Sequence, residues 1–345
     1  MIEVKKNTII YVACPANAAT GGPELLHQLV FKMNQFGYNA MMFYYPNNVE
    51  DPVHPRYKKY GNEFVREIRD EEKNILIVPE VKTDLIYKYK KLRKAIWWLS
   101  VNYFPRYPRS FKHRIKIILK TIKNQKWCYN FEHIDKLYHL VQSYYAKNYL
   151  LSHGIERDRI EYLSDYINPL FISKQLENKN DLRKENIVAY NPKKGFEFTK
   201  KIIDRCPEIK FVPIINMIPE EVAELLLKSK IYIDFGDHPG KDRIPREAAI
   251  SNCVVIVGKK GSAVFEEDVP IDEKYKFEVK KANIPQIINK IKYILNNYEN
   301  IINDFVGYRQ FILEEERKFE EDIKRIFISN WGVKMKIETL VIGAG

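Results

Sequence analysis

The feature that most constrains the fold is an alternation of short apolar runs with amphipathic segments, which begins twice along the chain. Residues 7–13 predict a buried strand, residues 24–36 predict an amphipathic helix, and residues 39–45 predict a second strand that ends before Pro46. Such a β-α-β unit opens a parallel, doubly wound α/β sheet. In this half, further strands are expected at residues 74–78, 96–101 and 139–143.

The alternation starts again after a polar stretch at residues 164–186, which we interpret as an inter-domain linker. A chain of 345 residues exceeds the size at which one hydrophobic core usually stops growing. We therefore expect two α/β domains, at residues 1–165 and 166–327, and a tail at 328–345. In the second half, strands are expected at 186–191, 209–215, 231–236 and 253–258, with helices at 196–206, 219–230 and 284–327.

Composition and cysteine usage exclude several classes of protein. Hydrophobic residues make up 45% of the chain, enough for packed cores rather than disorder. The four cysteines, Cys14, Cys128, Cys206 and Cys253, form no CxxC pair and indicate neither a zinc site nor a disulfide framework. The first residues show no signal-peptide pattern, and no apolar run approaches the roughly 18–20 residues that span a bilayer. The sequence therefore predicts a cytoplasmic protein, soluble or peripheral to a membrane.

Positive charge is concentrated in one segment. The net charge is +12, and residues 82–126 contain fourteen Lys or Arg and one acidic residue, Asp84. Aromatic residues, among them Trp97 and Trp98, are interleaved with these cations. Such a segment indicates an anionic membrane surface or nucleic acid as a partner. A solvated helical face whose aromatic residues belong to the core explains it as well.

Four loops at the expected strand ends combine glycines with charged side chains or helix N-termini. In an open parallel sheet, ligands bind beyond the carboxyl ends of the strands, where helix N-termini present free N–H groups. Glycines let the backbone approach an anion closely. Each loop alone is also explained as a solvated turn, but together they predict a nucleoside-diphosphate site. The loops are Ala19–Gly22, Asn191–Gly195, residues 236–247 and Gly258–Ser262.

The loop at residues 236–247 carries most of the charge and leads into the sequence Glu247-Ala248-Ala249. With the apolar strand that follows, this stretch resembles part of the glutamate motif of GT-B glycosyltransferases, particularly the retaining family 4 of bacterial capsule and lipopolysaccharide synthesis. The resemblance spans most of residues 8–327. It implies a GT-B fold, in which two Rossmann-like domains face a central cleft and C-terminal helices cross back. It also implies transfer of a hexose from a nucleotide-diphosphate sugar with retention.

The resemblance assigns roles to single residues of the donor site. By this likeness Glu247 accepts hydrogen bonds from the donor ribose, and Lys194 neutralises the pyrophosphate. Ser262 matches a small-residue loop near the donor. Gly21 and Gly22 match the glycine loop of the first domain that faces the donor phosphates.

The chain departs from the family pattern at two positions. Pro239 stands where the family has the glutamate that contacts the sugar, so that Asp237, His238 or Asp242 is left to take over part of its role. The arginine that usually precedes the lysine is also absent, and Lys193 is expected to substitute as a point charge.

The expected reaction breaks the bond between the donor sugar and a nucleoside diphosphate. Negative charge develops on the leaving phosphate, so cations near it stabilise the transition state. We expect Lys194 to act with Arg243 or Arg246, and His238 is a candidate general base. The sequence shows no DxD at a strand end and no His/Cys cluster, which predicts a reaction without a metal or cofactor.

The expected acceptor is a glycan or a polyprenyl-diphosphate-linked sugar, bound by the first domain at the inner face of the cell membrane. The 82–126 segment would then lie on the anionic surface. Two competing functions are a basic nucleic-acid-binding protein and a nucleotide-sugar-binding protein without catalysis.

The tail at Met335–Gly345, MKIETLVIGAG, resembles the first strand and turn of a flavoprotein dinucleotide-binding domain. An additional apolar strand explains it equally.

Overall fold

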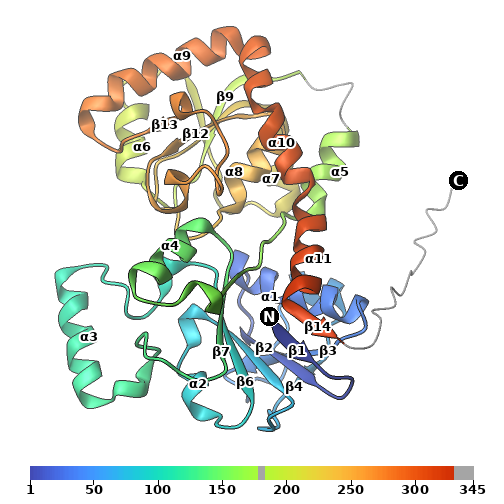
Figure 1. Cartoon of the computed structure of the whole chain (residues 1–345). Helices are drawn as coiled ribbons and strands as arrows, with labels where there is room; N and C mark the ends of the chain where they lie inside the picture. Colours follow the sequence, from blue (N-terminus) through green and yellow to red (C-terminus); the bar gives the residue numbers. More distant parts are fainter. Residues whose placement is uncertain (178–182, 330–345) are drawn as a thin grey trace, which may run out of the picture. The chain divides into compact units, whose positions relative to one another are not determined.

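The computed structural model describes residues 1–177 and 183–329, which divide into two compact units (Figure 1). The first unit comprises Met1–Gln142, Tyr149–Leu163 and the described residues from Glu320 onward. The second unit comprises Ser143–Asn148 and Ser164–Phe319. Each unit is built around its own parallel sheet.

The first unit holds a seven-stranded parallel sheet in the order β4-β3-β2-β5-β6-β7-β8. All five residues of β5 are buried, as expected for a central strand of a parallel sheet that helices cover. The strand bounds are β2 (Ile9–Pro15), β3 (Asn39–Tyr45), β4 (Phe64–Val65), β5 (Ile75–Pro79), β6 (Arg93–Trp98), β7 (Leu137–Val141) and β8 (Ile160–Tyr162).

Helix α1 (Gly21–Gln35) packs against this sheet through an apolar face that includes Leu25, Leu29 and Met33. Glycine at position 37 lets the chain leave the helix with a φ of +82°. The unit also contains α2 (Leu85–Lys88), α3 (Phe111–Lys123) and the short 3-10 helices η1 (Pro55–Tyr60), η2 (Glu80–Lys82), η3 (Val101–Tyr103), η4 (Gln125–Trp127) and η5 (Arg157–Arg159).

A separate two-stranded parallel sheet joins distant parts of the sequence within the first unit. Strand β1 (Ile2–Val4) pairs with β14 (Phe327–Ser329). Helix α11 (Glu315–Ile326) leads into β14, and α4 (Tyr144–Ser152) follows β7; both helices contain a boundary between the units.

The second unit holds a five-stranded parallel sheet in the order β10-β9-β11-β12-β13. The strand order reverses between β9 and β11, because the chain passes from β9 outward to β10 and then returns to the other side of β9. The strand bounds are β9 (Glu185–Tyr190), β10 (Lys210–Pro213), β11 (Ser229–Asp234), β12 (Val254–Gly258) and β13 (Lys276–Phe277).

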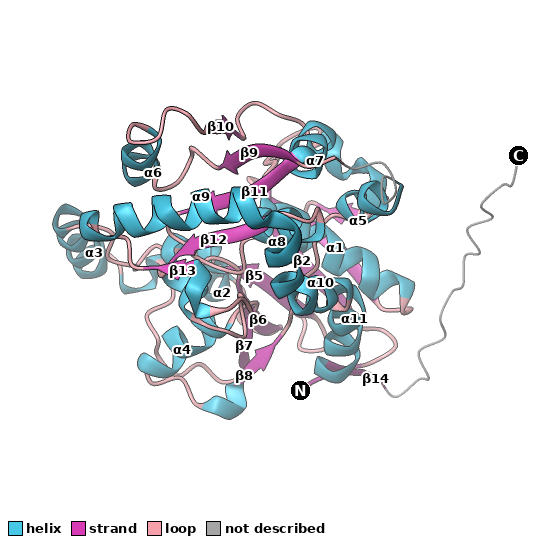
Figure 2. Cartoon of the chain, turned by 90° about the horizontal axis from the view of Figure 1, so that it is seen from above, coloured by secondary structure: helices cyan, strands magenta, loops and turns pink. Residues whose placement is uncertain are grey.

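Helices cover the second sheet, and α9 packs along β11 and β12 (Figure 2). Its buried residues recur at Ile284, Ile287, Ile291 and Ile294, the spacing of one helical face. The helices of this unit are α5 (Pro169–Glu177), α6 (Phe196–Ile203), α7 (Pro219–Lys228), α8 (Arg243–Ile250), α9 (Ile284–Ile301) and α10 (Val306–Leu313), with η6 (Gly261–Val264), η7 (Glu273–Tyr275), η8 (Lys281–Asn283) and η9 (Ile302–Phe305).

The predicted α/β class with parallel sheets is confirmed. The stretch interpreted as a linker instead contains helix α5, because Phe171 is buried in the core of the second unit. One boundary between the units falls after Leu163. Residues 143–148, which the sequence placed in the first domain, belong to the second unit, and residues 320–327, which it placed in the second domain, belong to the first. The tail at 335–345 lies outside the described residues.

No helix in the described part of the chain has both the length and the apolar character needed to cross a bilayer.

Candidate functional site

The reversal of strand order in the second sheet defines a position where ligands bind in doubly wound folds. Strands β9 and β11 are neighbours here, with Tyr190 opposite Ile233. The loop at residues 191–195 follows β9, and the loop at residues 235–242 follows β11. Two of the four loops that the sequence singled out therefore leave adjacent strands at one edge of the sheet.

Glycines allow these loops to pack directly on one another. Gly195 has a φ of +63°, and a Cβ atom at this position would lie 2.6 Å from the backbone N of Gly236. Gly261 has a φ of +55°, and a Cβ atom there would overlap the carbonyl oxygen of His238. Only glycine fits such positions, because other L-residues are strained at these φ values and meet backbone atoms.

Ser262 attaches the loop at Gly258–Ser262 to the loop at residues 235–242. Its backbone N–H donates to the carbonyl of His238 at 2.9 Å, and its Oγ donates to the carbonyl of Gly240 at 2.6 Å. The side chain is fully buried. The structure therefore brings together the loops that contain Lys194, His238 and Ser262, and it shows Ser262 hydrogen-bonded to the backbone of the β11 loop.

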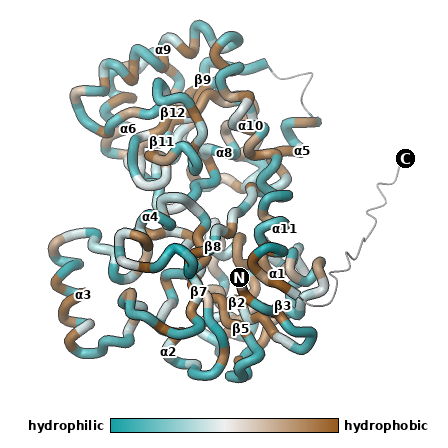
Figure 3. Tube along the Cα trace, in the orientation of Figure 1, coloured by the Kyte–Doolittle hydropathy of each residue, from teal (hydrophilic) through white to brown (hydrophobic). Residues whose placement is uncertain are grey.

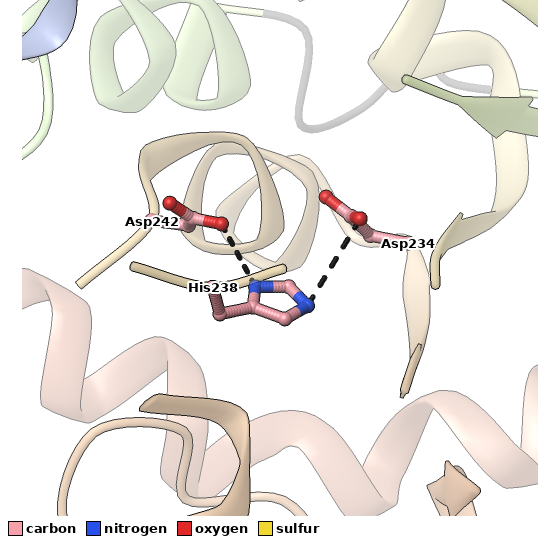
Figure 4. Close-up of side chains that lie close together, drawn as sticks. All are labelled: Asp234, His238 and Asp242. Carbon is pink, nitrogen blue, oxygen red and sulfur yellow. Dashed lines mark ion pairs between the residues drawn. The ribbon is translucent and has the colours of Figure 1, made fainter. Parts of the chain in front are cut away.

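A cluster of ionisable side chains occupies the ends of these loops (Figure 4). The imidazole Nδ1 of His238 lies 2.8 Å from a carboxylate oxygen of Asp242, and its Nε2 lies 4.0 Å from Asp234. The ammonium of Lys194 forms ion pairs with Asp242 and with Asp234, the latter at 3.9 Å. Asp234 also accepts hydrogen bonds from the backbone N–H of Gly236 and the hydroxyl of Tyr232.

The charges in this cluster stabilise one another. Burial alone would lower the pKa of His238, but the carboxylates of Asp242 and Asp234 outweigh it and raise this pKa. Burial favours the neutral form of Asp242, yet Lys194 and His238 hold its pKa below the ordinary value. The acidic side chains of Asp234 and Asp242 thus lie beside the ammonium of Lys194 and the imidazole of His238.

The same cluster has the spacing of a candidate metal site. One ligand atom each from Asp234, His238 and Asp242 lie within 4.8 Å of one another. The ammonium of Lys194 already pairs with both carboxylates, so a metal ion bound here would have to displace it. The donor set thus fits a lysine-neutralised cluster better than a cation site.

Arg246 lies in a different, fully buried ion cluster of the second unit. Its guanidinium contacts Asp165 at 2.6 Å and Glu315 at 2.8 Å, and it donates to the carbonyls of Lys241 and Asp242. The ammonium of Lys241 lies 2.8 Å from Glu315. Despite burial, Arg246 and Lys241 hold the pKa of the Asp165 carboxyl below its usual value. Arg246 therefore holds α8 to residues far away in the sequence, and its side chain has no exposed surface.

The remaining predicted donor residues of the second unit lie on α8 and in the loops that follow β9 and β11. Glu247 lies on α8 and is 8% exposed, and Arg243 is the first residue of that helix. Asp237 is exposed and pairs with Lys260 at 3.5 Å. Lys193 is exposed at the turn before Lys194. Pro239, the departure from the family pattern, is buried.

The fourth loop belongs to the first unit, where the strand order reverses between β2 and β5. Gly21 and Gly22 begin α1 after β2, and the preceding Thr20 provides no side-chain cap for the N–H groups of the helix. Glu80 follows β5 at the same reversal. It is 2% exposed and accepts a hydrogen bond of 2.9 Å from the backbone N–H of Leu99.

Glu80 is a residue that the sequence analysis did not single out. Burial raises its pKa to about 7, although backbone N–H groups, including that of Leu99, oppose the shift. Its only signal in the sequence is an acidic residue directly after a buried strand. The strand order is needed to see that it shares a topological switch point with Gly21 and Gly22.

Solved structures similar to this chain are glycosyltransferases of the GT-B fold. HepE of Anabaena in complex with UDP-glucose is 10% identical over 92% of this chain and 99% of its own, with a TM-score of 0.59. Sucrose-phosphate synthase of Thermosynechococcus elongatus is 12% identical over 93% and 98%, with a TM-score of 0.64. A glycosyltransferase from Rickettsia africae is 13% identical over 91% and 98%, with a TM-score of 0.52.

The chain therefore has the GT-B fold, as the sequence predicted. No family model and no curated protein matches the sequence.

Proposed function

We propose that this chain is a glycosyltransferase that moves a sugar from a nucleotide-diphosphate sugar to an acceptor hydroxyl. The observation that carries the proposal is the position of Lys194, at the carboxyl edge between β9 and β11 where the strand order reverses. The GT-B fold supports it, because HepE with this fold was crystallised with UDP-glucose and with UDP.

In the proposed reaction, the bond between the sugar C1 and the diphosphate oxygen breaks, and the electron pair stays on the diphosphate. The acceptor oxygen forms the new bond to C1, and its proton passes to the diphosphate that leaves. Negative charge grows on the leaving diphosphate, so a fixed cation beside it lowers the barrier. The side chain of Lys194 is 24% exposed, which leaves its ammonium within reach of a ligand.

The donor diphosphate is proposed to take the place of Asp242 in the ion pair with Lys194. A diphosphate that approaches Lys194 competes with Asp242 for the ammonium. His238 is buried against Asp242 and remains to neutralise that carboxylate. We therefore assign His238 and Asp242 a positioning role, in place of the general base that the sequence suggested for His238.

Other residues of the donor site follow from the family resemblance. We propose that Glu247 binds the donor ribose and that Arg243, Lys193 and Asp237 lie around the phosphates and the sugar. Arg246 is proposed to position α8 through Asp165 and Glu315, because its guanidinium is fully engaged in these buried ion pairs.

The acceptor is proposed to be a glycan or a polyprenyl-diphosphate-linked sugar of bacterial surface polysaccharide synthesis, bound by the first unit. Glu80 lies at the topological switch point of this unit. Gly21 and Gly22 begin α1 at the same switch point, and by the family resemblance they are proposed to face the donor phosphates. We also propose a hexosyl transfer with retention that needs no metal ion. Full activity in excess EDTA would agree with the last point, and loss restored by a divalent cation would contradict it.

A thermal-shift screen against UDP, GDP, dTDP and their sugars tests the donor site, because a ligand that binds the native state raises the melting temperature. We expect one base to stabilise the protein. Glu247→Ala should abolish that shift, whereas Glu224→Ala, on the exposed face of α7, should retain it.

A second pair of variants tests the proposed cation. Lys194→Gln should lower sugar transfer at least a hundredfold, in the range seen when one group that stabilises transition-state charge is removed. Lys201→Gln, an exposed lysine of α6, should transfer at the wild-type rate. Donor binding without transfer or hydrolysis would identify a nucleotide-sugar-binding protein instead. Stabilisation that persists in Glu247→Ala would overturn the assignment of the ribose contact.

A further inference from the structure

Helix α3 (Phe111–Lys123) of the first unit has no buried residue. Figure 3 shows it at the margin of this unit, with hydrophobic and hydrophilic residues in alternation. A Ser110 hydroxyl caps its start by accepting from the backbone N–H of His113. Its exposed apolar side chains are Phe111 (78%), Ile115 (44%), Ile118 (57%), Leu119 (61%) and Ile122 (78%).

These apolar residues form one continuous face, because they recur at intervals of four, three, one and three positions. A different face, with His113, Ile117 and Thr121 at intervals of four, is partly buried. Thr121 accepts a hydrogen bond of 2.9 Å from the guanidinium of Arg106. The helix is thus held to the protein by one face and presents its apolar face outward.

Cations occupy the rest of the helix surface. The sequence of α3 contains no acidic residue. Within residues 1–177 and 183–329, none of its Lys or Arg side chains takes part in an ion pair. Lys120 alone makes a specific contact, over the ring of Trp127 at 4.8 Å. The five cations are Lys112, Arg114, Lys116, Lys120 and Lys123.

Only some residues of the 82–126 segment are exposed and therefore available to a partner. Trp97 and Trp98, which the sequence placed at a membrane surface, are fully buried in β6. They belong to the core of the first unit and cannot reach lipid. Within the 82–126 segment, exposed apolar area and free cations occur together on α3.

We propose that α3 docks the protein on an anionic phospholipid bilayer. The helix lies in the headgroup region, with its apolar face among the acyl chains and its cations at the lipid phosphates. Amphipathic helices with Lys and Arg on the polar face and Phe and Leu on the other bind membranes in this way. Charge complementarity favours this partner, since the helix carries five cations and no acid.

Other partners satisfy only part of this surface. Nucleic acid would neutralise the cations but leave the five large apolar side chains in water. A second copy of the chain would cover the apolar face but bring two sets of five cations together. One helix of thirteen residues is also short for the roughly 800 Å² per partner that stable protein interfaces bury.

Flotation of the full-length protein with vesicles tests the proposal without any donor. We expect binding to vesicles that contain phosphatidylglycerol and little binding to pure phosphatidylcholine. Each basic residue near an anionic surface contributes about a fivefold factor to partitioning. The triple variant Lys112→Gln, Lys116→Gln, Lys123→Gln should therefore bind about a hundredfold more weakly.

Matched variants separate α3 from net charge and from general hydrophobicity. Lys88→Gln with Lys90→Gln and Lys91→Gln removes the same charge from exposed positions outside α3, and it should weaken binding less than about threefold. Ile118→Ser with Ile122→Ser should release the protein. Ile215→Ser with Leu313→Ser, at positions about half exposed in the second unit, should not.

A site-specific label measures whether the apolar face enters the bilayer. The four native cysteines are buried, so an introduced cysteine can be labelled selectively with an environment-sensitive fluorophore. A label at Leu119→Cys should be quenched by lipids that carry a nitroxide in the acyl chain, and one at Lys116→Cys should not.

Three results would overturn the proposal. The first is an equal loss of binding in the two triple-lysine variants. The second is retention on RNA or DNA without vesicle binding. The third is an Ile118→Ser, Ile122→Ser variant that changes oligomeric state but not vesicle binding. Circular dichroism should show that each variant is folded.

Discussion

The carboxyl edges of the two sheets share a topology but differ in their chemistry. In both sheets the strand order reverses at a defined pair of strands, β2 and β5 in the first unit and β9 and β11 in the second. The edge of the second sheet carries interlocked loops and a cluster in which Lys194 and His238 lie beside Asp234 and Asp242. The edge of the first sheet carries a buried carboxyl, Glu80, held by backbone N–H groups.

The difference shows two ways of holding charge at a sheet edge. In the second unit, the ammonium of Lys194 pairs with buried or partly buried carboxylates and stabilises them. In the first unit, burial makes ionisation of the Glu80 carboxyl unfavourable. The partner that this carboxyl gains or loses most easily is therefore a proton. The first two predictions contrast a group of the second unit with a matched group of the first, and the last compares two glutamates of the first unit.

The largest expected effect is the difference in lost stability between breaking a buried ion pair and breaking an exposed one. Arg246→Leu removes the cation that pairs with both buried carboxylates, Asp165 and Glu315, which should lower the free energy of unfolding by about 3–5 kcal/mol. Arg325→Leu in the first unit breaks a pair with Glu161 whose arginine is 46% exposed, and it should cost less than about 1 kcal/mol. Urea unfolding measures both, and equal losses would contradict the contrast.

Glycine substitutions should give the next largest difference. Gly261 and Gly61 have nearly equal φ values of +55° and +58°, so Gly→Ala at either position costs about 1–2 kcal/mol through backbone strain. Only Gly261→Ala also forces a Cβ into the carbonyl of His238, whereas no atom lies within 4 Å of a Cβ at position 61.

Gly261→Ala should therefore lower the melting temperature clearly more than Gly61→Ala and should weaken donor binding. Calorimetry of the two variants, followed by titration with the nucleotide found in the screen, compares them. Equal melting temperatures would show that the loops of the second unit are less tightly interlocked than described.

The last prediction concerns the dependence of stability on pH that Glu80 causes. Its pKa rises from 4.5 to about 7 on folding, so the folded state binds more protons between these values. The stability that this group contributes is complete below pH 4.5 and is lost as the pH rises to about 7. Glu80→Gln should remove this component and keep an oxygen that can accept from Leu99. Its stability relative to wild type should therefore increase between pH 4.5 and 7 and level off above that.

A matched control distinguishes this effect from a general change in charge. Glu63→Gln replaces an exposed glutamate of the same unit and should show no such rise relative to wild type. If the stabilities of Glu80→Gln and Glu63→Gln changed with pH in the same way over this range, the role given to Glu80 would be refuted.

Local patterns were sufficient to predict most of the fold. The bounds of β3 (Asn39–Tyr45) and the first turn of α7 at Pro219 agree with the prediction, because an apolar run and a proline at a helix start act over a few residues. The loops with Lys194 and Ser262 were found because glycines at strand ends are visible in the sequence. Helix α5 was missed because Phe171 alone gives little periodicity in a polar stretch.

Contacts between distant residues could not be predicted. An arginine in a charged loop is equally suited to bind a phosphate or to pair with a buried carboxylate. Arg246 does the latter with Asp165 and Glu315, which are 81 and 69 positions away. The sequence likewise could not show that Trp97 and Trp98 lie inside the first unit while α3, in the same basic segment, lies outside.

The pairing of β1 with β14 has a consequence for how the protein is made. Residues 2–4 leave the ribosome well before their partner strand at 327–329, which is synthesised more than three hundred residues later. Most of the second unit, Ser164–Phe319, is an uninterrupted stretch that emerges before that partner. During translation the second unit can therefore complete its core before α11 and β14 are available to the first unit, although most of the first unit is synthesised earlier.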